Sequence, residues 1–551
     1  MTPDVVIIGS GAGGAAAAWR LCQHGLRVRL LEAGPRFDPA RDYSLTQPGW
    51  ERRQFPDPPG SRAEITYGDL GHLDDDDADL ASWNAVTGRQ ITGTRRVPRP
   101  GYSHVLGVGG STLHYVGEAH RMHPESFDLK ARTGSGADWP LDYATLEPFY
   151  TEVEDLIGVA GPAQADARWR DKPHPLSPHP LSPAAAALSA AGAEVGMTWQ
   201  ANSRAALSRP YDGRPACNYC GNCSRGCPIG DKGSADVTFL RHAEATGNLE
   251  LTTGAVVTGI IPGGNGRIAA VDYVQDGDRH RIETPVLVLA GGAVQTPRLL
   301  LASATADQPD GLANGSGAVG RHFMETLLWR SAGLAPDVSM SHADLPADAI
   351  CWDYSAPDGV PGAMGGRRFG SDVQESGLNG PIAYASRLIP GFGAAFKQRM
   401  RAQFSTAISV SGIGAVVPDA RSKVDLHPGR ADAHGLPLPR IHSVLTKNSM
   451  TLLCFMADRA RALLSASGVE HPSEEGGSWD RFTATHVFGT CRMGNDARTS
   501  VVNAQGRSHD HANLFIADAS VFPSTGGGEA PSLTIQALAL RTADDIARVA
   551  K

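Results

Sequence analysis

Short apolar runs and glycine clusters alternate at the start of the chain. Residues 5–8 read Val-Val-Ile-Ile, a glycine-rich stretch covers residues 9–14, residues 15–24 are rich in helix formers, and residues 27–32 return to a strand pattern. A buried strand, a helix and a second buried strand in this order are typical of a βαβ unit in a parallel sheet. We therefore expect the chain to open with such a unit.

The glycines of this unit have the spacing GxGxxG. Gly9 permits a tight turn after the first strand, and Gly11 lets the backbone around Ala12 approach a pyrophosphate. Gly14 lets the helix pack closely on the strand, and Glu32 stands at the end of the second strand, where it can accept a hydrogen bond from a ribose hydroxyl. Because strand, helix and acidic residue are in register, the sequence predicts a dinucleotide site formed by these five residues.

The pattern of a nucleotide-binding domain returns twice. Residues 286–292 form an apolar strand and turn followed by a helix over 296–302, and residues 514–518 form a strand ending in Asp518, followed by a helix over 533–549. Between them, residues 311–472 read as strands and loops. We therefore expect an α/β fold in which a Rossmann-like nucleotide-binding domain is built from discontinuous segments, 1–40, 95–125, 235–310 and 480–551, with a cap and cysteine region at 126–234. Residues 311–479 are expected to form an α+β substrate-binding domain with an antiparallel sheet.

Length and composition narrow the classes of function. A chain of 551 residues exceeds one compact core, which favours two domains. The net charge of −8 gives no basic footprint for nucleic acid. The sequence shows no secretory signal and no stretch of about 18 consecutive apolar residues, so we expect no membrane span. The expected compartment is the cytoplasm, with the periplasm open through co-export with a partner.

Four of the eight cysteines lie within eleven residues. They are Cys217, Cys220, Cys223 and Cys227, with Pro228 directly after. The spacing CxxCxxCxxxCP is the one with which bacterial ferredoxins hold iron–sulfur clusters, and we favour that interpretation. Structural zinc or unmetallated thiols remain open, although zinc usually shows two separated CxxC pairs. Two local disulfides also remain open if the protein is exported.

Over nearly its whole length the chain resembles the glucose–methanol–choline (GMC) family of FAD-dependent oxidoreductases. Four separated motifs carry the resemblance: the GxGxxG with Glu32, residues 107–112 (GVGGST), residues 292–297 (GAVQTP), and residues 486–494 (HVFGTCRMG) followed by 518–523 (DASVFP). The resemblance implies oxidation of an alcohol to a carbonyl by hydride transfer to flavin N5. It also places FAD contacts at Gly109, Gly110, Ser111, His114, Val257, Asp518 and Ala519.

His486 matches the catalytic histidine of the family. A neutral imidazole at the substrate hydroxyl can take its proton as hydride leaves the same carbon, which is the chemistry that alcohol oxidation requires. The family usually supplies a second His or Asn after the strand at Asp518. Here the sequence departs, because counting from Asp518 gives Glu529 and aligning on Pro531 gives Ala530. Glu529 is a candidate partner in catalysis, or alternatively a charge at a helix N-terminus.

His114 falls where some relatives attach FAD covalently through histidine. Position alone does not establish a bond, and we favour noncovalent FAD with His114 close to the flavin ring. The substrate pocket is expected to draw on residues 311–472, where Trp352 and Tyr354 either stack on a sugar or belong to the core.

The combined expectation is an FAD-dependent dehydrogenase of an alcohol, such as a sugar or glycoside hydroxyl. Some bacterial GMC dehydrogenases carry a similar cysteine run and pass electrons from flavin through a cluster to a cytochrome, so the resemblance implies an iron–sulfur cluster and an electron-accepting cytochrome or small partner subunit. Three alternatives stay open: an oxygen-reducing oxidase with structural cysteines, a non-catalytic electron-transfer subunit, and a lyase on the same fold.

Overall fold

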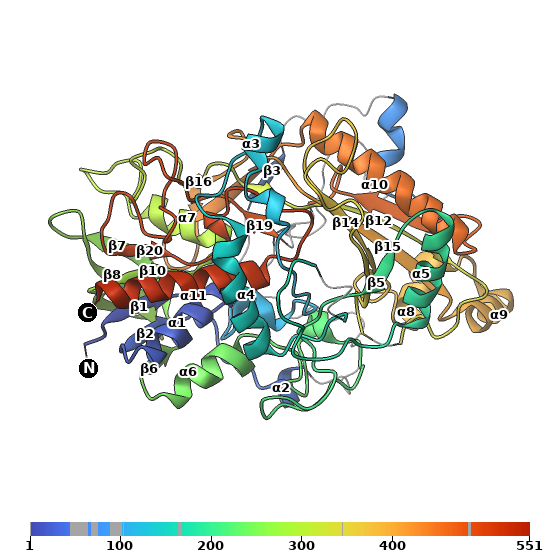
Figure 1. Cartoon of the computed structure of the whole chain (residues 1–551), viewed down its shortest axis with the longest axis horizontal. Helices are drawn as coiled ribbons and strands as arrows, with labels where there is room; N and C mark the ends of the chain where they lie inside the picture. The colour runs from blue at the N-terminus through green and yellow to red at the C-terminus, as the bar shows by residue number, and fades with distance from the viewer. Residues whose placement is uncertain are drawn as a thin grey trace.

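Five short parallel strands form the centre of one half of the molecule (Figure 1). The computed structural model describes residues 2–43, 64–67, 75–88, 102, 104–163, 168–343, 345–482 and 486–550. The strands stand in the order β20-β10-β1-β2-β6, and all four pairings are parallel. Their bounds are β1 Val5–Ile8, β2 Val28–Leu31, β6 Leu249–Thr252, β10 Leu287–Leu289 and β20 Leu514–Ile516.

Small residues let the first helix lie close to this sheet. Helix α1 (Ala12–Gln23) begins after the glycine turn and carries a run of alanines, all of them buried. A Cβ atom at Gly13 would lie 1.6 Å from the carbonyl oxygen of Ala517, so only glycine permits this approach. Helix α11 (Ser532–Val549) packs on α1 and on α4 (Tyr143–Ile157).

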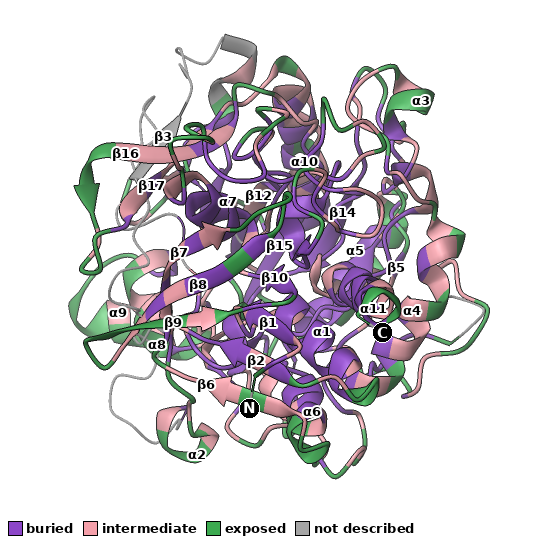
Figure 2. Ribbon diagram, turned by 90° about the vertical axis from the view of Figure 1, so that its left-hand side faces the viewer, coloured by how far each residue is buried: buried purple, intermediate pink, exposed green. Residues whose placement is uncertain are grey.

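A smaller antiparallel sheet completes this half. It consists of β7 (Val256–Pro262), β8 (Ile268–Gln275) and β9 (Asp278–Glu283), and β7 contacts helix α7 (Gly292–Ala302). Figure 2 shows β7 and β8 over the buried strands of the parallel sheet, with β9 more exposed. Helix α6 (Arg241–Ala245) precedes β6 and contacts α1.

The other half is built on a seven-stranded sheet in the order β4-β18-β12-β15-β14-β13-β5. Every pairing within it is antiparallel. Helices α10 (Lys447–Ala466) and α5 (Pro183–Glu194) pack against it. The strands are β4 Trp83–Asn84, β5 Trp199–Ala201, β12 Leu327–Leu334, β13 Ala349–Cys351, β14 Arg367–Ser371, β15 Ala407–Gly414 and β18 Glu474–Gly477.

The remaining strands and helices are short. They are β3 Glu64–Tyr67, β16 Lys423–Ala431, β17 Pro437–Ser443, β11 Met324–Glu325, β19 Val487–Phe488, α2 Pro39–Asp42, α3 Leu129–Thr133, α8 Pro381–Ala383 and α9 Gly393–Gln403. One hydrophobic cluster runs from the parallel sheet into the seven-stranded sheet, so the halves share a core.

The predicted fold class is confirmed. Strands from distant parts of the chain assemble a Rossmann-like sheet, and a second, antiparallel sheet stands beside it. The domain bounds themselves stay a prediction, and residues 95–101 and 103 of the second segment lie outside the described residues. The stretch that otherwise reads as strands and loops also contains α10, a 20-residue helix in which the apolar segment around Cys454 lies. Its buried positions recur every three or four residues, a period that the stretch as a whole obscures. No helix among the described residues has both the length and the apolar character to cross a membrane.

Candidate active site

A cavity of about 790 Å³ lies at the carboxyl ends of the parallel strands. The residues that follow four of these strands line it: Gly9 after β1, Glu32 after β2, Ala290 after β10 and Asp518 after β20. Ligands of open α/β sheets bind at this edge, and the volume is within the usual range of about 300–1,000 Å³ for ligand sites. The far wall comes from the seven-stranded sheet, with Arg330 on β12 and Ile413 on β15.

The glycine turn has the geometry that its spacing predicts. Gly9 has a φ of +96°, and a Cβ atom there would stand 2.6 Å from the carbonyl oxygen of Ala290. A Cβ at Gly14 would lie 1.9 Å from the Gly9 oxygen, so Gly14 permits the close helix contact without lining the cavity. Gly11 and Ala12 do line it. The turn therefore leaves backbone open to a ligand at the start of α1.

Glu32 faces the same turn. Its Oε2 accepts hydrogen bonds from the Ser10 amide (3.0 Å) and hydroxyl (2.6 Å), and its Oε1 accepts one from the Gly34 amide (2.9 Å). Burial raises the pKa of this carboxyl, while these bonds favour its charge. Glu32 is thus oriented by the protein at the place where a ribose hydroxyl is expected.

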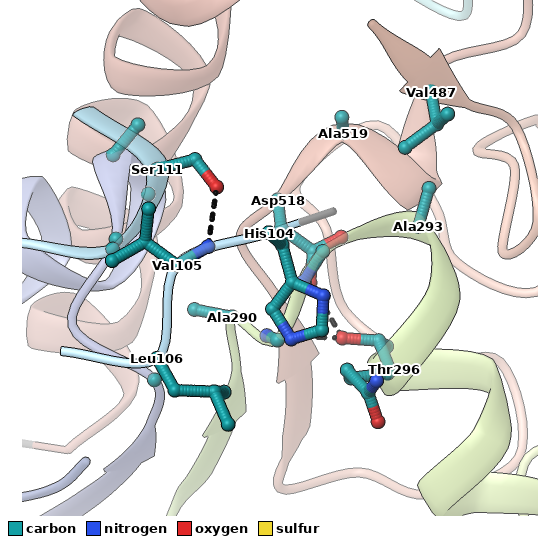
Figure 3. Close-up of a pocket in the computed structure, with 18 of the residues that line it drawn as sticks. His104, Val105, Leu106, Ser111, Ala290, Ala293, Thr296, Val487, Asp518 and Ala519 are labelled. Carbon is teal, nitrogen blue, oxygen red and sulfur yellow. Dashed lines mark hydrogen bonds between the residues drawn. The ribbon is translucent and has the colours of Figure 1, made fainter. Parts of the chain in front are cut away.

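Asp518 organises the opposite side of the cavity (Figure 3). Its Oδ2 accepts hydrogen bonds from the Thr296 hydroxyl (2.6 Å) and the Gly292 amide (2.9 Å), and its Oδ1 accepts one from the Ser520 amide (2.8 Å). Ala519 and Val257 also line the cavity. The carboxylate holds β20 to the start of α7.

The GGST motif lies directly against the glycine turn. Gly109 and Gly110 have φ of +106° and +55°, and a Cβ at Gly110 would stand 2.6 Å from the Cα of Gly11. Ser111 lines the cavity, and its hydroxyl accepts a hydrogen bond from the Val105 amide at 3.3 Å (Figure 3). Two glycine segments almost 100 residues apart in sequence therefore meet at one wall.

His486 precedes β19 and lines the cavity. Its Nδ1 is buried and has no hydrogen-bond partner among the described residues. Burial lowers the pKa of His486 to about 4. The smaller effects of Glu118, which raises this pKa, and of Arg368, which lowers it, oppose each other. The imidazole is consequently neutral at pH 7, the form that accepts a proton.

Glu118 is a charged residue of the same site that the sequence did not reveal. It lines the cavity, and its carboxylate accepts hydrogen bonds from Arg368 and, at 2.8 Å, from the Asn202 side chain. Burial opposes its charge, but Arg368, His120, Arg204 and Asn202 together outweigh this and hold the pKa of Glu118 below its usual value. Glu118 lies only four residues after His114, yet nothing in the spacing marks it as part of a site.

Glu529 is held by hydrogen bonds outside the cavity lining. Its Oε1 accepts hydrogen bonds from Arg168 and from the His123 amide, both at 3.2 Å, and its Oε2 accepts one from the Gly527 amide. The Arg168 guanidinium lies over the ring of Trp352, 3.8 Å from the ring centre. Glu529 is 2% exposed and does not line the cavity.

Ala530 lines the cavity in place of Glu529. Its amide donates to Nδ1 of His120 at 3.0 Å, so His120 presents Nε2–H to the Asn202 side-chain oxygen at 2.8 Å. Tyr354, a candidate for substrate stacking, instead meets Phe369 and Phe455 edge-on in the core.

Three further histidines, His104, His114 and His434, line the cavity. Burial lowers the pKa of His114 to about 4, with Lys232 contributing. His104, which sequence reasoning did not single out, has the same lowered pKa of about 4 from burial and Arg298, and both of its ring nitrogens lack partners among the described residues. Figure 3 shows His104 near Asp518 and Thr296.

The loop of the four clustered cysteines reaches the same cavity. Ser224, which follows Cys223 in sequence, is a lining residue. Lys232 ties the loop to the segment after the GGST motif by donating to the carbonyls of Leu113, Tyr115 and Cys223, each at 2.8 Å. Burial raises the pKa of all four thiols.

The metal prediction is not confirmed by the structure. All eight cysteines are free, and in the described part of the chain no three His, Cys, Asp or Glu side chains are arranged to hold a metal ion. The Cys227 thiol donates to Asp231 at 2.8 Å instead. The donor set nevertheless suits an iron–sulfur cluster by its chemistry and spacing.

Comparison with known proteins decides the family. Two family models described as GMC oxidoreductase match residues 107–327 and 418–539, and one described as an NAD(P)-binding Rossmann-like domain matches residues 7–39. A 2-methyl-1,2-propanediol dehydrogenase from Mycolicibacterium austroafricanum is 30% identical, over 99% of this chain and 95% of its own. This chain belongs to the GMC oxidoreductase family. It is accordingly an FAD-dependent alcohol oxidoreductase with a Rossmann-like fold.

Other relatives in the family differ in what they are named for. The fructose dehydrogenase large subunit of Gluconobacter japonicus is 28% identical, over 99% of this chain and 98% of its own. The 6'''-hydroxyparomomycin C oxidase of Streptomyces lividus is 30% identical, over 99% and 91%. A solved structure, pyridoxine 4-oxidase from Mesorbium loti, shares the fold with a TM-score of 0.59 at 20% identity and covers 99% of both chains.

The cavity fits FAD. The cofactor needs a glycine turn at a helix N-terminus for its pyrophosphate, a carboxylate for its ribose and a long cleft for the remainder. The turn at Gly9 to Gly11, the oriented Glu32 and the facing glycines at 109 and 110 provide these features in one cavity.

Proposed function

We propose that this protein oxidises the CH–OH group of an alcohol carrying further hydroxyl groups, as a sugar or glycoside does, with His486 as the base. The observation that carries the proposal is the placement of a neutral imidazole in the wall of the FAD cavity. Bound FAD would supply the hydride acceptor. His486 would take the hydroxyl proton, which makes loss of hydride from the same carbon feasible.

The charged pair beside His486 supports this role. Once His486 has taken a proton, the ionised Glu118 stabilises the imidazolium, while Arg368 keeps Glu118 charged. The cavity therefore keeps the base neutral before the reaction and limits the cost of its charge afterwards.

Glu529 enters the proposal as a positioning residue and not as a group that touches substrate. Its bonds to Arg168 and to the Gly527 amide support this, because they fix the turn that precedes Ala530. His114 is proposed to lie beside noncovalently bound FAD, which its lining position supports.

The finer proposal concerns the exit of electrons. Cys217, Cys220, Cys223 and Cys227 would hold an iron–sulfur cluster that serves an external acceptor. The spacing of the four thiols supports it, as does the contact of their loop with the cavity at Ser224. The relative named as the large subunit of fructose dehydrogenase supports a further proposal, that a small partner subunit or a cytochrome receives the electrons.

The test begins with anaerobic, FAD-loaded protein and a panel of alcohols. Bleaching of the flavin by an alcohol supports the oxidation. Dye or cytochrome reduction in preference to peroxide formation then supports a dehydrogenase, and this matters because relatives of both kinds are similar to the chain. Iron and sulfide analysis of the same sample tests the cluster, and zinc or no metal would contradict it.

A further inference from the structure

One carboxyl group in the cavity has no protein partner. Five carboxylates line the cavity: Glu32, Glu118, Glu375, Asp432 and Asp518. Four of them are held by hydrogen bonds or ion pairs within the protein. Glu375 is exposed to the cavity and forms no hydrogen bond or ion pair with any described residue.

The charged groups around Glu375 determine its protonation state. Asp372 is bonded to Arg330 and to the Ser376 hydroxyl (2.7 Å), so it does not compete for a ligand in the cavity. Burial, together with the negative charges of Asp372 and Glu118, raises the pKa of Glu375 well above its usual value, although Arg204 and Arg368 oppose this. At neutral pH the carboxyl is therefore largely protonated and can both donate and accept.

Arg330 lies beside this carboxyl on the wall opposite the parallel sheet. Its Nε and one Nη donate to Asp372, the second at 3.2 Å, while its other Nη makes no hydrogen bond to a described residue. Burial opposes the charge of Arg330, but Asp372 and, more weakly, Glu375 raise its pKa, so it stays a cation. Arg330 and Glu375 both line the cavity with His486.

We propose that Glu375 and Arg330 recognise hydroxyl groups of the substrate other than the one that is oxidised, and that they select polyhydroxylated alcohols over mono-alcohols. The inference rests on the proposed function, since it assigns specificity to the same site. A hydroxyl group donates one hydrogen bond and can also accept one. A protonated carboxyl offers both an acceptor and a donor for it, and a neighbouring guanidinium adds further donors. A mono-alcohol with an alkyl tail would cover the Glu375 carboxyl and the free Nη of Arg330 without pairing them, which a binding site penalises strongly.

The test compares six-carbon alcohols that differ in their hydroxyl groups. The probes are D-sorbitol, D-mannitol and myo-inositol against 1-hexanol, with D-glucosamine as a cationic probe. Variants are Glu375→Leu, Glu375→Gln and the matched control Glu283→Gln, an exposed carboxylate on β9 far from the cavity lining. Anaerobic flavin reduction gives kcat/KM, and calorimetric titration of dithionite-reduced holoenzyme, in which oxidation cannot proceed, gives binding alone.

For Glu375→Leu we expect a loss of roughly 10- to 100-fold in kcat/KM and in affinity for the best polyol, with 1-hexanol changed less than about threefold. Glu375→Gln keeps a donor and an acceptor and should stay within about fivefold of wild type. If the Leu variant does not fold, Glu375→Ala replaces it, and the same losses are expected.

Several results would overturn the inference. The first is an unchanged kcat/KM and affinity for polyols in Glu375→Leu. The second is a preference of the wild-type protein for 1-hexanol. The third is a preference for D-glucosamine together with a loss of kcat/KM in Glu375→Gln as large as in Glu375→Leu. The last result would mean that a carboxylate recognises a cation. If no alcohol bleaches the flavin, the proposed function fails, and the calorimetric arm still decides the inference: weaker polyol binding in Glu375→Leu supports it, and no polyol binding overturns it.

Discussion

Replacing His486 by asparagine should stop the chemistry while leaving the protein intact. The pKa of about 4 means that about one imidazole in a thousand is protonated at pH 7, whereas an ordinary histidine of pKa about 6.5 would be protonated in about a quarter of molecules. The base is therefore available in almost every molecule. Its loss should slow flavin reduction by roughly 10²- to 10⁴-fold, or about 3–5 kcal/mol of barrier.

The structure also predicts what this variant leaves unchanged. The Nδ1 atom of His486 has no hydrogen-bond partner among the described residues, so no protein bond is lost, and the melting temperature and FAD content should match those of wild type. His280→Asn, an exposed ring on β9, serves as the control for histidine loss in general. Anaerobic stopped-flow measurement of flavin reduction at a saturating alcohol concentration gives the rate.

The lowered pKa of His486 also predicts how the rate of flavin reduction depends on pH. A folded-state pKa below the unfolded value means that neutral His486 is present throughout pH 6–8, so wild-type flavin reduction should be flat there and fall only as pH approaches about 4. Buried His104 and His114 have equally lowered pKa values, so stability present above about pH 6.5 should decline as pH falls toward 4. A rate loss below about threefold in His486→Asn, or an acid limb centred near pH 6.5, would refute the reasoning.

Three further variants test the cofactor cradle, the positioning residue and the cysteine loop. Gly14→Ala brings a methyl group into the carbonyl of the turn and should lower FAD content and melting temperature, whereas Gly259→Ala, with open space around it, should change neither, as flavin absorbance and calorimetry will show. Glu529→Ala breaks a buried ion pair and should lower the free energy of unfolding by roughly 3 kcal/mol, measured in urea, while the pH at which flavin reduction falls stays as in wild type; a shifted pH profile would instead indicate a catalytic carboxyl. Cys223→Ser should lose iron where Cys22→Ser does not, and equal iron in both would count against the cluster.

Local sequence pattern was sufficient for much of the fold. The strand, glycine turn and helix at residues 5–23 are neighbours in sequence, so their periodicity and spacing predict both the βαβ unit and the roles of Gly9 and Gly14. His486 could be found because a motif surrounds it. The apolar helix around Cys454 could be expected, but not the bounds of α10, because its helical period lies inside a stretch dominated by strands.

Glu118 and Glu375, two charged residues of the cavity, escaped prediction for a physical reason. Glu118 meets Arg368 across 250 residues of sequence, and Glu375 reaches the cavity from the segment after β14. Such encounters depend on how two sheets face one another, which spacing does not encode. The choice between Glu529 and Ala530 also required coordinates, because the preceding turn has glycines at φ of +76° and +93° that counting cannot resolve.

The central claim is that an alcohol delivers hydride to FAD in this cavity with His486 as base. The most direct measurement is the visible absorbance spectrum of anaerobic, FAD-loaded protein after addition of a polyol, recorded for wild type and His486→Asn. The account predicts rapid bleaching of the flavin in wild type and bleaching slowed at least about a hundredfold in the variant. Failure of every alcohol to bleach the wild-type flavin, or equal rates in the two proteins, would contradict it.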